Sequence, residues 1–359
     1  MLQRLCTLFF MLILNTAHAE NPESEAIKHL ANINKFLSVA PQRSRSILIS
    51  HSDSVRFLDV QKKIAWHNAG ATIGLKLNDL NLFERSLKRL VDLITRDNLK
   101  QHRVSSLVLL GHYSLKSNFL IEAIYAYNCV YVSAENQNDK ILAAYRTANA
   151  YLSAGNIDKA ELIMKKLLSI AENQGKKSWF GPLKSTMGIY ALHRKDYLVA
   201  EHFFVESMNA HQEIHNNSGE FNSLLNLLLT LALANSEKFE RIEYRVARLS
   251  EKNKDMDREL LLKLILLLRS SKLNESDIKH KELANQYFEQ IQSSTVKAAV
   301  EDFIFPALNI DVDKAPLVTP PIWIINSLKK LQCNAEAVNL KQVLADLSNI
   351  EKNSTIQNR

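Results

Sequence analysis

Glycine and proline are both scarce in this chain, which contains 8 and 7 of them among 359 residues. No proline lies between Pro41 and Pro182. Because β-sandwiches and barrels need many turn residues, this scarcity argues against an all-β fold. It favours long helices, whose interiors tolerate neither residue well. A single globular core would be large for this length, whereas a repeat array is not limited in that way, since each unit packs only on its neighbours.

Cysteine is scarce as well, and only Cys6, Cys129 and Cys333 are present. Such a small number excludes a disulfide scaffold. Cys129 and Cys333 are separated by about 200 residues, and in an elongated array residues so far apart in sequence usually lie far apart in space. A disulfide needs Cα atoms within about 7 Å. We therefore expect these two cysteines not to be bonded to each other, although the sequence leaves their thiol state open.

The first 19 residues resemble a signal peptide. Arg4 supplies a positive charge, an apolar run follows over Leu5–Leu14, and small residues precede a cleavage position after Ala19. An uncleaved N-terminal anchor is the alternative. The most apolar later segment, Leu260–Leu268, is too short to span a bilayer and contains a lysine. We expect a periplasmic or secreted protein with no membrane span after cleavage.

The net charge of +7 is spread along the chain. Its densest basic runs are only pairs, such as Lys62-Lys63 and Lys329-Lys330. A nucleic-acid-binding surface would cluster its basic residues and interleave them with aromatic ones. The charge pattern therefore argues against nucleic acid as a partner and favours an acidic partner only weakly.

The middle of the chain repeats a pattern of small, aromatic and turn residues. Its clearest unit is Ala144–Leu168, in which the anchors are Ala148, Tyr151, Gly155-Asn156, Ile157, Ala160 and Met164. This order resembles the tetratricopeptide repeat (TPR), in which a small residue and an aromatic one precede a turn, and a second small residue follows it.

The same anchors recur in the neighbouring units. The first small position holds Gly74, Gly111, Ala148, Gly188 and, as a poorer match, Thr230; the second holds Ser86, Ala123, Ala160, Ala200, Ile242 and Ala284. The second series is spaced by 37, 37, 40, 42 and 42 residues, longer than the usual 34. Small residues at these positions let two antiparallel helices cross closely.

The resemblance implies an all-α fold, an α-solenoid of antiparallel helix pairs in a TPR-like right-handed superhelix. We expect a signal peptide at 1–19, an N-terminal helical cap at 20–59 and an array of about six units at 60–293, the last two degenerate. A C-terminal helical cap at 294–351 and a disordered tail at 352–359 complete the prediction. Within the two caps we expect helices near 24–38, 322–331 and 335–349.

Motifs for catalysis are largely missing. The chain has no glycine-rich phosphate loop, no G-x-S-x-G and no C-x-x-C. His211 and His215 are spaced to share a helix face, but the sequence is not H-E-x-x-H, so a solvated helix end is favoured over a zinc site. We expect no enzymatic activity, no cofactor and no metal.

The resemblance also places a binding groove on the first helix of each repeat. Its expected partner-binding residues are Asn68, His112, Tyr145, Asn149, Asn222 and Asn226, the last two in a register uncertain by one residue. Asparagine can donate and accept together, so it can hold a peptide backbone without reading its side chains. The alternative is that these asparagines are ordinary solvated residues.

Three functions are compatible with the sequence. The preferred one is an exported scaffold or adaptor for a protein or peptide, within a bacterial cell envelope. The second is a periplasmic sensory or regulatory module that binds a peptide or small ligand and signals through a partner protein. The third, a hydrolase or metal enzyme on a helical array, has no supporting motif, although the fold alone does not exclude it.

Overall fold

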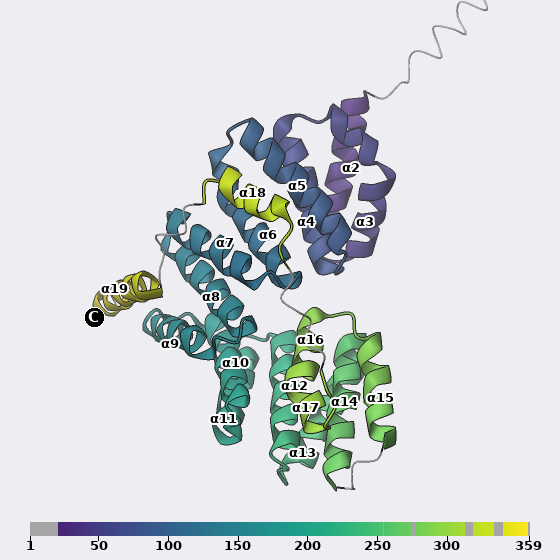
Figure 1. The fold of residues 1–359 in the computed structure, drawn as a ribbon, viewed down its shortest axis with the longest axis vertical. Helices are drawn as coiled ribbons and strands as arrows, with labels where there is room; N and C mark the ends of the chain where they lie inside the picture. The colour runs from purple at the N-terminus through teal and green to yellow at the C-terminus, as the bar shows by residue number, and fades with distance from the viewer. Residues whose placement is uncertain (1–20, 254, 274–277, 313–318, 334–339, 358–359) are drawn as a thin grey trace, which may run out of the picture. The chain divides into compact units, whose positions relative to one another are not determined.

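The computed structural model describes residues 21–253, 255–273, 278–312, 319–333 and 340–357. All regular structure within these ranges is helical, and antiparallel helices pack in succession on their neighbours (Figure 1). The predicted fold class, an all-α array of helix pairs, is therefore confirmed. The predicted signal peptide at 1–19 lies outside the described residues.

The chain divides into two compact units. The first unit comprises the chain up to Tyr113 together with Trp323–Gln332. Its elements are α2 (Pro22–Phe36), α3 (Pro41–Ser50), η1 (Ser52–Phe57), α4 (Val60–Lys76), α5 (Leu80–Arg96), η2 (Lys100–His102), the first part of α6 (Arg103–Lys116) and most of α18 (Ile322–Lys330). One of its cores joins α2, α3 and α4 through buried residues such as Ile33, Leu48 and Trp66.

The second unit comprises Ser114–Ile322 and the chain from Cys333 onward. Its helices up to residue 253 are α7 (Leu120–Ser133), α8 (Gln137–Ser153), α9 (Ile157–Asn173), α10 (Lys177–His193), α11 (Tyr197–Glu213), α12 (Asn217–Leu233) and α13 (Phe239–Asn253). Those that follow are α14 (Met256–Leu273), α15 (Ile278–Gln290), α16 (Ser294–Ala299), η3 (Val300–Ile304), α17 (Phe305–Ala307) and α19 (Leu340–Gln357). A leucine-rich core of this unit surrounds α12, in which Leu224 and Leu228 are fully buried.

A recurring turn joins the helices, and it places residues other than glycine in the left-handed conformation that usually ends a helix. At the end of α4, Asn78 adopts a left-handed conformation with a φ of 54°. The next residue, Asp79, donates its amide to the carbonyl of Gly74 at 2.9 Å and accepts the amide of Leu82 at 3.0 Å. The first bond closes α4 and the second opens α5.

The same turn recurs with Lys195-Asp196 and His215-Asn216, where the left-handed residue is again not glycine. Among the described residues, only Gly155 and Gly175 occupy this conformation as glycines. Because asparagine tolerates it at modest cost, the array can place its remaining glycines elsewhere.

Five of those glycines, Gly70, Gly74, Gly181, Gly188 and Gly219, lie where two helices approach closely. A Cβ atom added to Gly188 on α10 would lie 2.7 Å from the Phe204 ring of α11. One added to Gly74 would lie 2.6 Å from the backbone nitrogen of Phe83. The atoms nearest to these two added Cβ atoms belong to a bulky residue or to backbone, and not to the small residue of the second helix. It is Gly70 that meets the small anchor Ser86.

The helices expected near 24–38 and 322–331 correspond to α2 and α18, and α3 is a helix that the sequence did not predict. Within the first unit α18 packs on α5 and α6. The Trp323 ring lies 5.2 Å from that of Tyr113, between centroids, and the Nζ of Lys88 lies 4.9 Å from the Trp323 ring. Lys330 forms an ion pair with Asp92 at 2.9 Å.

Cys129 of α7 and Cys333 form a disulfide, contrary to the expectation from their sequence separation. Their Cα atoms are 5.5 Å apart, within the range that a disulfide needs. The expectation was wrong because distance along the sequence measures distance in space only in an array that never folds back. The segment that contains Cys333 returns to α7, where the Tyr125 hydroxyl donates to the Cys333 carbonyl at 3.4 Å.

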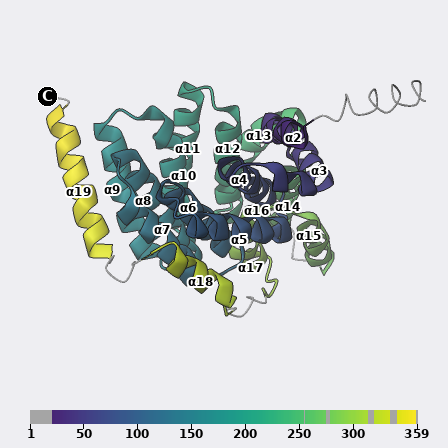
Figure 2. The ribbon, with the colours of Figure 1, turned by 90° about the horizontal axis from the view of Figure 1, so that it is seen from above.

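The last helix, α19, lies beside α9 (Figure 2). Val343 and Leu347 are buried, and Glu351 accepts a hydrogen bond from Lys166 at 3.0 Å and another from Ser169. The predicted disordered tail at 352–359 is thus corrected over residues 352–357, which continue this helix. Residues 335–339 of the expected last helix, and residues 358 and 359, lie outside the described part. No helix among the described residues is long and apolar enough to cross a membrane.

Candidate functional site

The predicted groove residues of the second unit lie on the first helices of successive pairs. Tyr145 and Asn149 are half-buried on α8, and Asn226 is half-buried on α12. On the intervening α10, burial first and then the neighbouring Tyr145 and Glu161 raise the pKa of Tyr190. The Nδ2 of Asn226 donates to the Ser185 hydroxyl of α10 at 3.4 Å. The structure therefore links these side chains from one first helix to the next.

The regular spacing of the helices resolves the uncertain register of α12. Helices α8, α10 and α12 have 17 residues each and begin forty residues apart, at Gln137, Lys177 and Asn217. Asn222 therefore corresponds to Leu142 of α8, three residues before Tyr145. Asn226 is offset by one residue from the position that Tyr145 and Ser185 occupy. Asn222 is exposed, and so it is the better placed of the two to meet a ligand.

The two predicted residues of the first unit are less informative. Asn68 is exposed on α4, and its carbonyl accepts a hydrogen bond from Thr72 at 2.9 Å. His112 is half-buried on α6. Both belong to the first compact unit, whereas the residues on α8 and α12 belong to the second.

His211 is not a solvated helix-end residue, as its sequence context suggested, but is 5% exposed. Its ring fills the space beside Gly181 of α10 and Gly219 of α12, where an added Cβ atom would meet it. The amide of Asn216 contacts its Nδ1 at 3.2 Å, and burial lowers the pKa of the ring. His215, by contrast, is exposed.

The two histidines thus differ in environment, since His211 is buried in a helix junction and His215 is exposed. Among the described residues, no group of three or more His, Cys, Asp or Glu side chains is arranged to hold a metal ion. The His211 ring of α11 packs between α10 and α12, against Gly181 of the first and Gly219 of the second.

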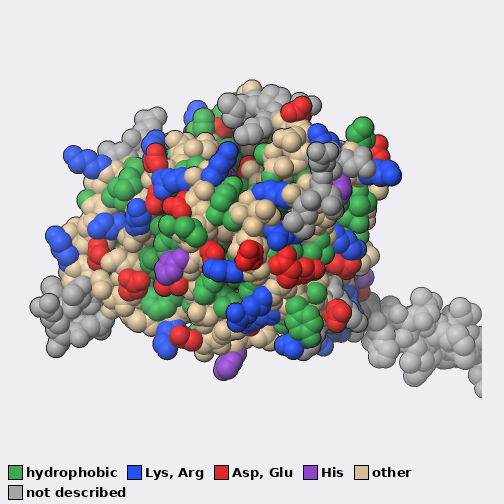
Figure 3. Space-filling view, turned by 90° about the horizontal axis from the view of Figure 1, so that it is seen from below, with side chains coloured by type: hydrophobic (Ala, Val, Ile, Leu, Met, Phe, Trp, Pro, Cys, Tyr) green, Lys and Arg blue, Asp and Glu red, His purple; other side chains and the backbone are tan. Residues whose placement is uncertain are grey.

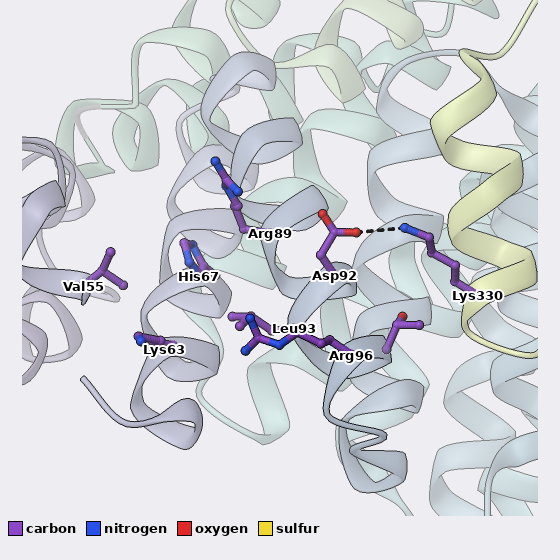
Figure 4. Close-up of a pocket in the computed structure, with 9 residues that line it drawn as sticks. Val55, Lys63, His67, Arg89, Asp92, Leu93, Arg96 and Lys330 are labelled. Atoms are coloured by element: carbon purple, nitrogen blue, oxygen red, sulfur yellow. Dashed lines mark hydrogen bonds and ion pairs between the residues drawn. The ribbon is translucent and has the colours of Figure 1, made fainter. Parts of the chain in front are cut away.

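A second candidate site, which the sequence interpretation missed, is a basic hollow of about 610 Å³ in the first unit. Figure 4 shows Lys63 and His67 of α4 on one side of it and Arg89, Leu93 and Arg96 of α5 on the other. Val55 of η1, Asp92, Thr95 and Lys330 complete its lining. The sequence does place these basic residues at helical spacing. Lys63 and His67 are four residues apart on one helix, and Arg89 and Arg96 are seven apart on the next, so each pair shares a helix face.

Charge on the surface can be followed on one face of the molecule. The face drawn in Figure 3 carries basic and acidic side chains interspersed with apolar ones, without a continuous patch of one sign.

Comparison with known proteins reveals similarity at the level of the fold. No family model matches the chain, and no curated protein does. The apo form of the quorum sensor NprR from B. thuringiensis superposes with a TM-score of 0.59 at 13% identity, covering 96% of this chain and 94% of that one.

A second similar structure is a STAND signal-transduction ATPase with a tetratricopeptide repeat sensor, from Pyrococcus horikoshii. It superposes with a TM-score of 0.55 at 14% identity. The match covers 81% of this chain but only 45% of the ATPase. Both similarities concern the fold alone, and they agree with the all-helical array of packed helix pairs described above.

Proposed function

We propose that this chain is a degenerate, exported TPR protein that acts as a scaffold or adaptor, binding a protein or peptide along the first helices of its repeats, and that it is not an enzyme. The observation that carries the proposal is the row of accessible polar and aromatic side chains on α8, α10 and α12. Tyr145, Asn149, Ser185 and Asn222 occupy it, on helices that repeat every forty residues. Backbone-binding asparagines and a tyrosine on a preformed rigid surface suit an extended or helical peptide.

Two features support export to the cell envelope. The first 19 residues have the charge, apolar run and small residues of a cleavable signal peptide. The disulfide between Cys129 and Cys333 points the same way, because such bonds persist mainly in oxidising compartments outside the cytosol.

A sensory or regulatory module is the second candidate. It is favoured by the two similar structures, of which one is a quorum sensor and the other a protein with a TPR sensor. In that case the same row of side chains would recognise a peptide or small ligand, and a partner protein would read out the bound state.

The test is affinity capture from a cell-envelope extract with the wild-type chain and a Tyr145→Ala/Asn149→Ala variant. We expect the wild type to retain a protein that the variant loses, because the substitutions remove the aromatic and the amide from one first helix. The matched control is Leu198→Ala/Asn209→Ala, which removes an apolar side chain and an amide that are both exposed on the second helix α11. This control should retain the partner.

Three outcomes would change the conclusion. Capture of the same partner by wild type and by the folded α8 variant would rule out the groove. Loss of the partner from the α11 control alone would move the site to the second helices. If no chain captures any protein, the sensor function is preferred, and small peptides become the next ligands to screen.

A further inference from the structure

The basic hollow between α4 and α5 holds more positive charge than its own acids neutralise. Lys330 is paired with Asp92 at 2.9 Å. Arg96 is paired with Asp97, through two bonds of 2.9 and 3.0 Å. Lys63 and Arg89 have no such partner: among the described residues, no carboxylate lies within 4.0 Å of either. Two cations are therefore left to face the hollow.

The pKa of His67, which lies between these two cations, reflects both its burial and their positive charge. Figure 4 shows His67 between Arg89 and Lys63. Burial lowers the pKa of His67 to about 4, and the charges of Arg89 and Lys63 act in the same direction. His67 is consequently neutral at pH 7, so one ring nitrogen is a donor and the other an acceptor. The acid that Lys63 does influence is Asp97, whose pKa is lowered first by Arg96 and in small part by Lys63.

A ligand that satisfies this site must carry about two negative charges on oxygen atoms. A phosphate monoester carries a charge of about −1.5 to −2 at pH 7 and has three acceptor oxygens. Arginine can bind two of these oxygens together, whereas lysine acts as a point charge. A monocarboxylate would leave one of the two cations unmatched. The apolar walls formed by Val55 and Leu93 offer room for an organic group attached to the phosphate.

We propose that this hollow binds the phosphate group of a small phosphorylated molecule, with Arg89 and Lys63 contacting its oxygens and His67 donating a hydrogen bond. The volume of about 610 Å³ lies within the range of small-ligand sites. The site shares no residue with the first-helix row on α8, α10 and α12, and so it does not depend on the proposed peptide binding.

The experiment is a calorimetric titration of the full chain at low ionic strength, because salt screens such contacts. The probes are inorganic phosphate, propyl phosphate and succinate. We expect saturable binding of both phosphates with a Kd of about 1 mM or below, with propyl phosphate the tighter because its alkyl group reaches the apolar walls. Inorganic phosphate binding the tighter of the two would overturn the part of the proposal that concerns an organic ligand.

Charge-removing variants locate the site. Arg89→Gln and Lys63→Gln should each weaken phosphate binding by about tenfold or more. The control is Arg85→Gln on the same helix, since Arg85 does not line the hollow and donates instead to the Asn81 carbonyl at 3.3 Å; it should bind phosphate as the wild type does. Equal binding by Arg89→Gln and wild type would overturn the proposal.

A second readout is independent of affinity. The imidazole pKa of His67, followed by NMR and assigned with His67→Gln, should rise by about one unit or more at saturating phosphate, because a bound anion favours the charged ring. An unchanged His67 titration in the presence of phosphate, or succinate binding as tightly as phosphate, would contradict the assignment.

Discussion

His211 is a residue of the second unit at which burial opposes a charge. Its ring lies among Gly181, Gly219 and the hydroxyls that hold the same junction together: Ser207 donates to the Gly181 carbonyl at 2.7 Å and lies 2.8 Å from the Ser223 hydroxyl. A proton added to this ring would bring a charge into a closely packed site. The junction is thus built around a neutral histidine.

This arrangement makes the stability of the second unit dependent on pH. Burial depresses the folded pKa of His211, so the unfolded chain binds the proton more readily. The neutral His211 ring contributes its full stabilisation above the pKa of the unfolded state, about 6.5. This contribution is lost as the pH falls through the lower pKa of the folded state. Urea unfolding followed from pH 7 downward should show His211→Gln losing less stability than the wild type. An equal loss in both would refute the prediction, and His215→Gln, which alters an exposed ring, should follow the wild type.

Gly188 offers a sharper test of close helix packing. A methyl group there would lie 2.7 Å from the Phe204 ring, and overpacking of this kind costs about 1–3 kcal/mol. Gly188→Ala should therefore lower the free energy of unfolding by that amount in urea. The same substitution in a Phe204→Leu background should cost less, because the obstructing ring is gone. A matching loss in both backgrounds would show that the ring is not the obstacle. Gly155→Asn, in open space at a φ of 73°, should change stability by less than about 0.5 kcal/mol.

At the scale of helices, periodicity and anchor residues in the sequence predict most of what the structure contains. The anchors Ala160 and Ala200 are fully buried on second helices, as a TPR-like pattern requires. Helix α3 was missed because its stripe is short and follows Pro41 closely, where the pattern is more typical of a linker. The basic hollow was missed because it needs two helices: neither Lys63 with His67 nor Arg89 with Arg96 indicates a site until α4 and α5 are antiparallel neighbours.

Among the described side chains of α19, only Val343 and Leu347 are buried, both where the helix packs along α9, and so α19 should be separable from the rest of the unit. Leu347 is fully buried, and truncating a buried leucine costs about 2–5 kcal/mol. Leu347→Ala should release α19, which hydrogen exchange would detect as faster exchange over residues 340–357 with little change in α10–α12. Uniformly faster exchange across the second unit would mean that α19 is an integral part of its core. Ser348→Ala provides the comparison, since the Ser348 hydroxyl only bonds back to the Leu344 carbonyl of its own helix.

At the scale of the whole chain, the disulfide is the feature that no local pattern could reveal. The repeat predicts where helices begin and how pairs pack, but each repeat contacts only its neighbours. A covalent bond between residues 204 positions apart depends instead on the path of the segment that follows the array. That path is set by surface contacts of individual residues, such as those of Trp323 and Cys333, and these carry no periodic signal.

The bond should matter most to the unfolded state. Closing so long a loop removes much conformational freedom from the unfolded chain, a stabilisation of about 2–5 kcal/mol. Cys129→Ala/Cys333→Ala should therefore unfold at lower urea than the wild type under non-reducing conditions, and the difference should vanish when the wild type is reduced. Peptide mapping without reductant should recover Cys129 and Cys333 in one linked species. Two free thiols in protein secreted through an oxidising compartment would contradict the bond, and with it the argument that this disulfide marks an exported protein.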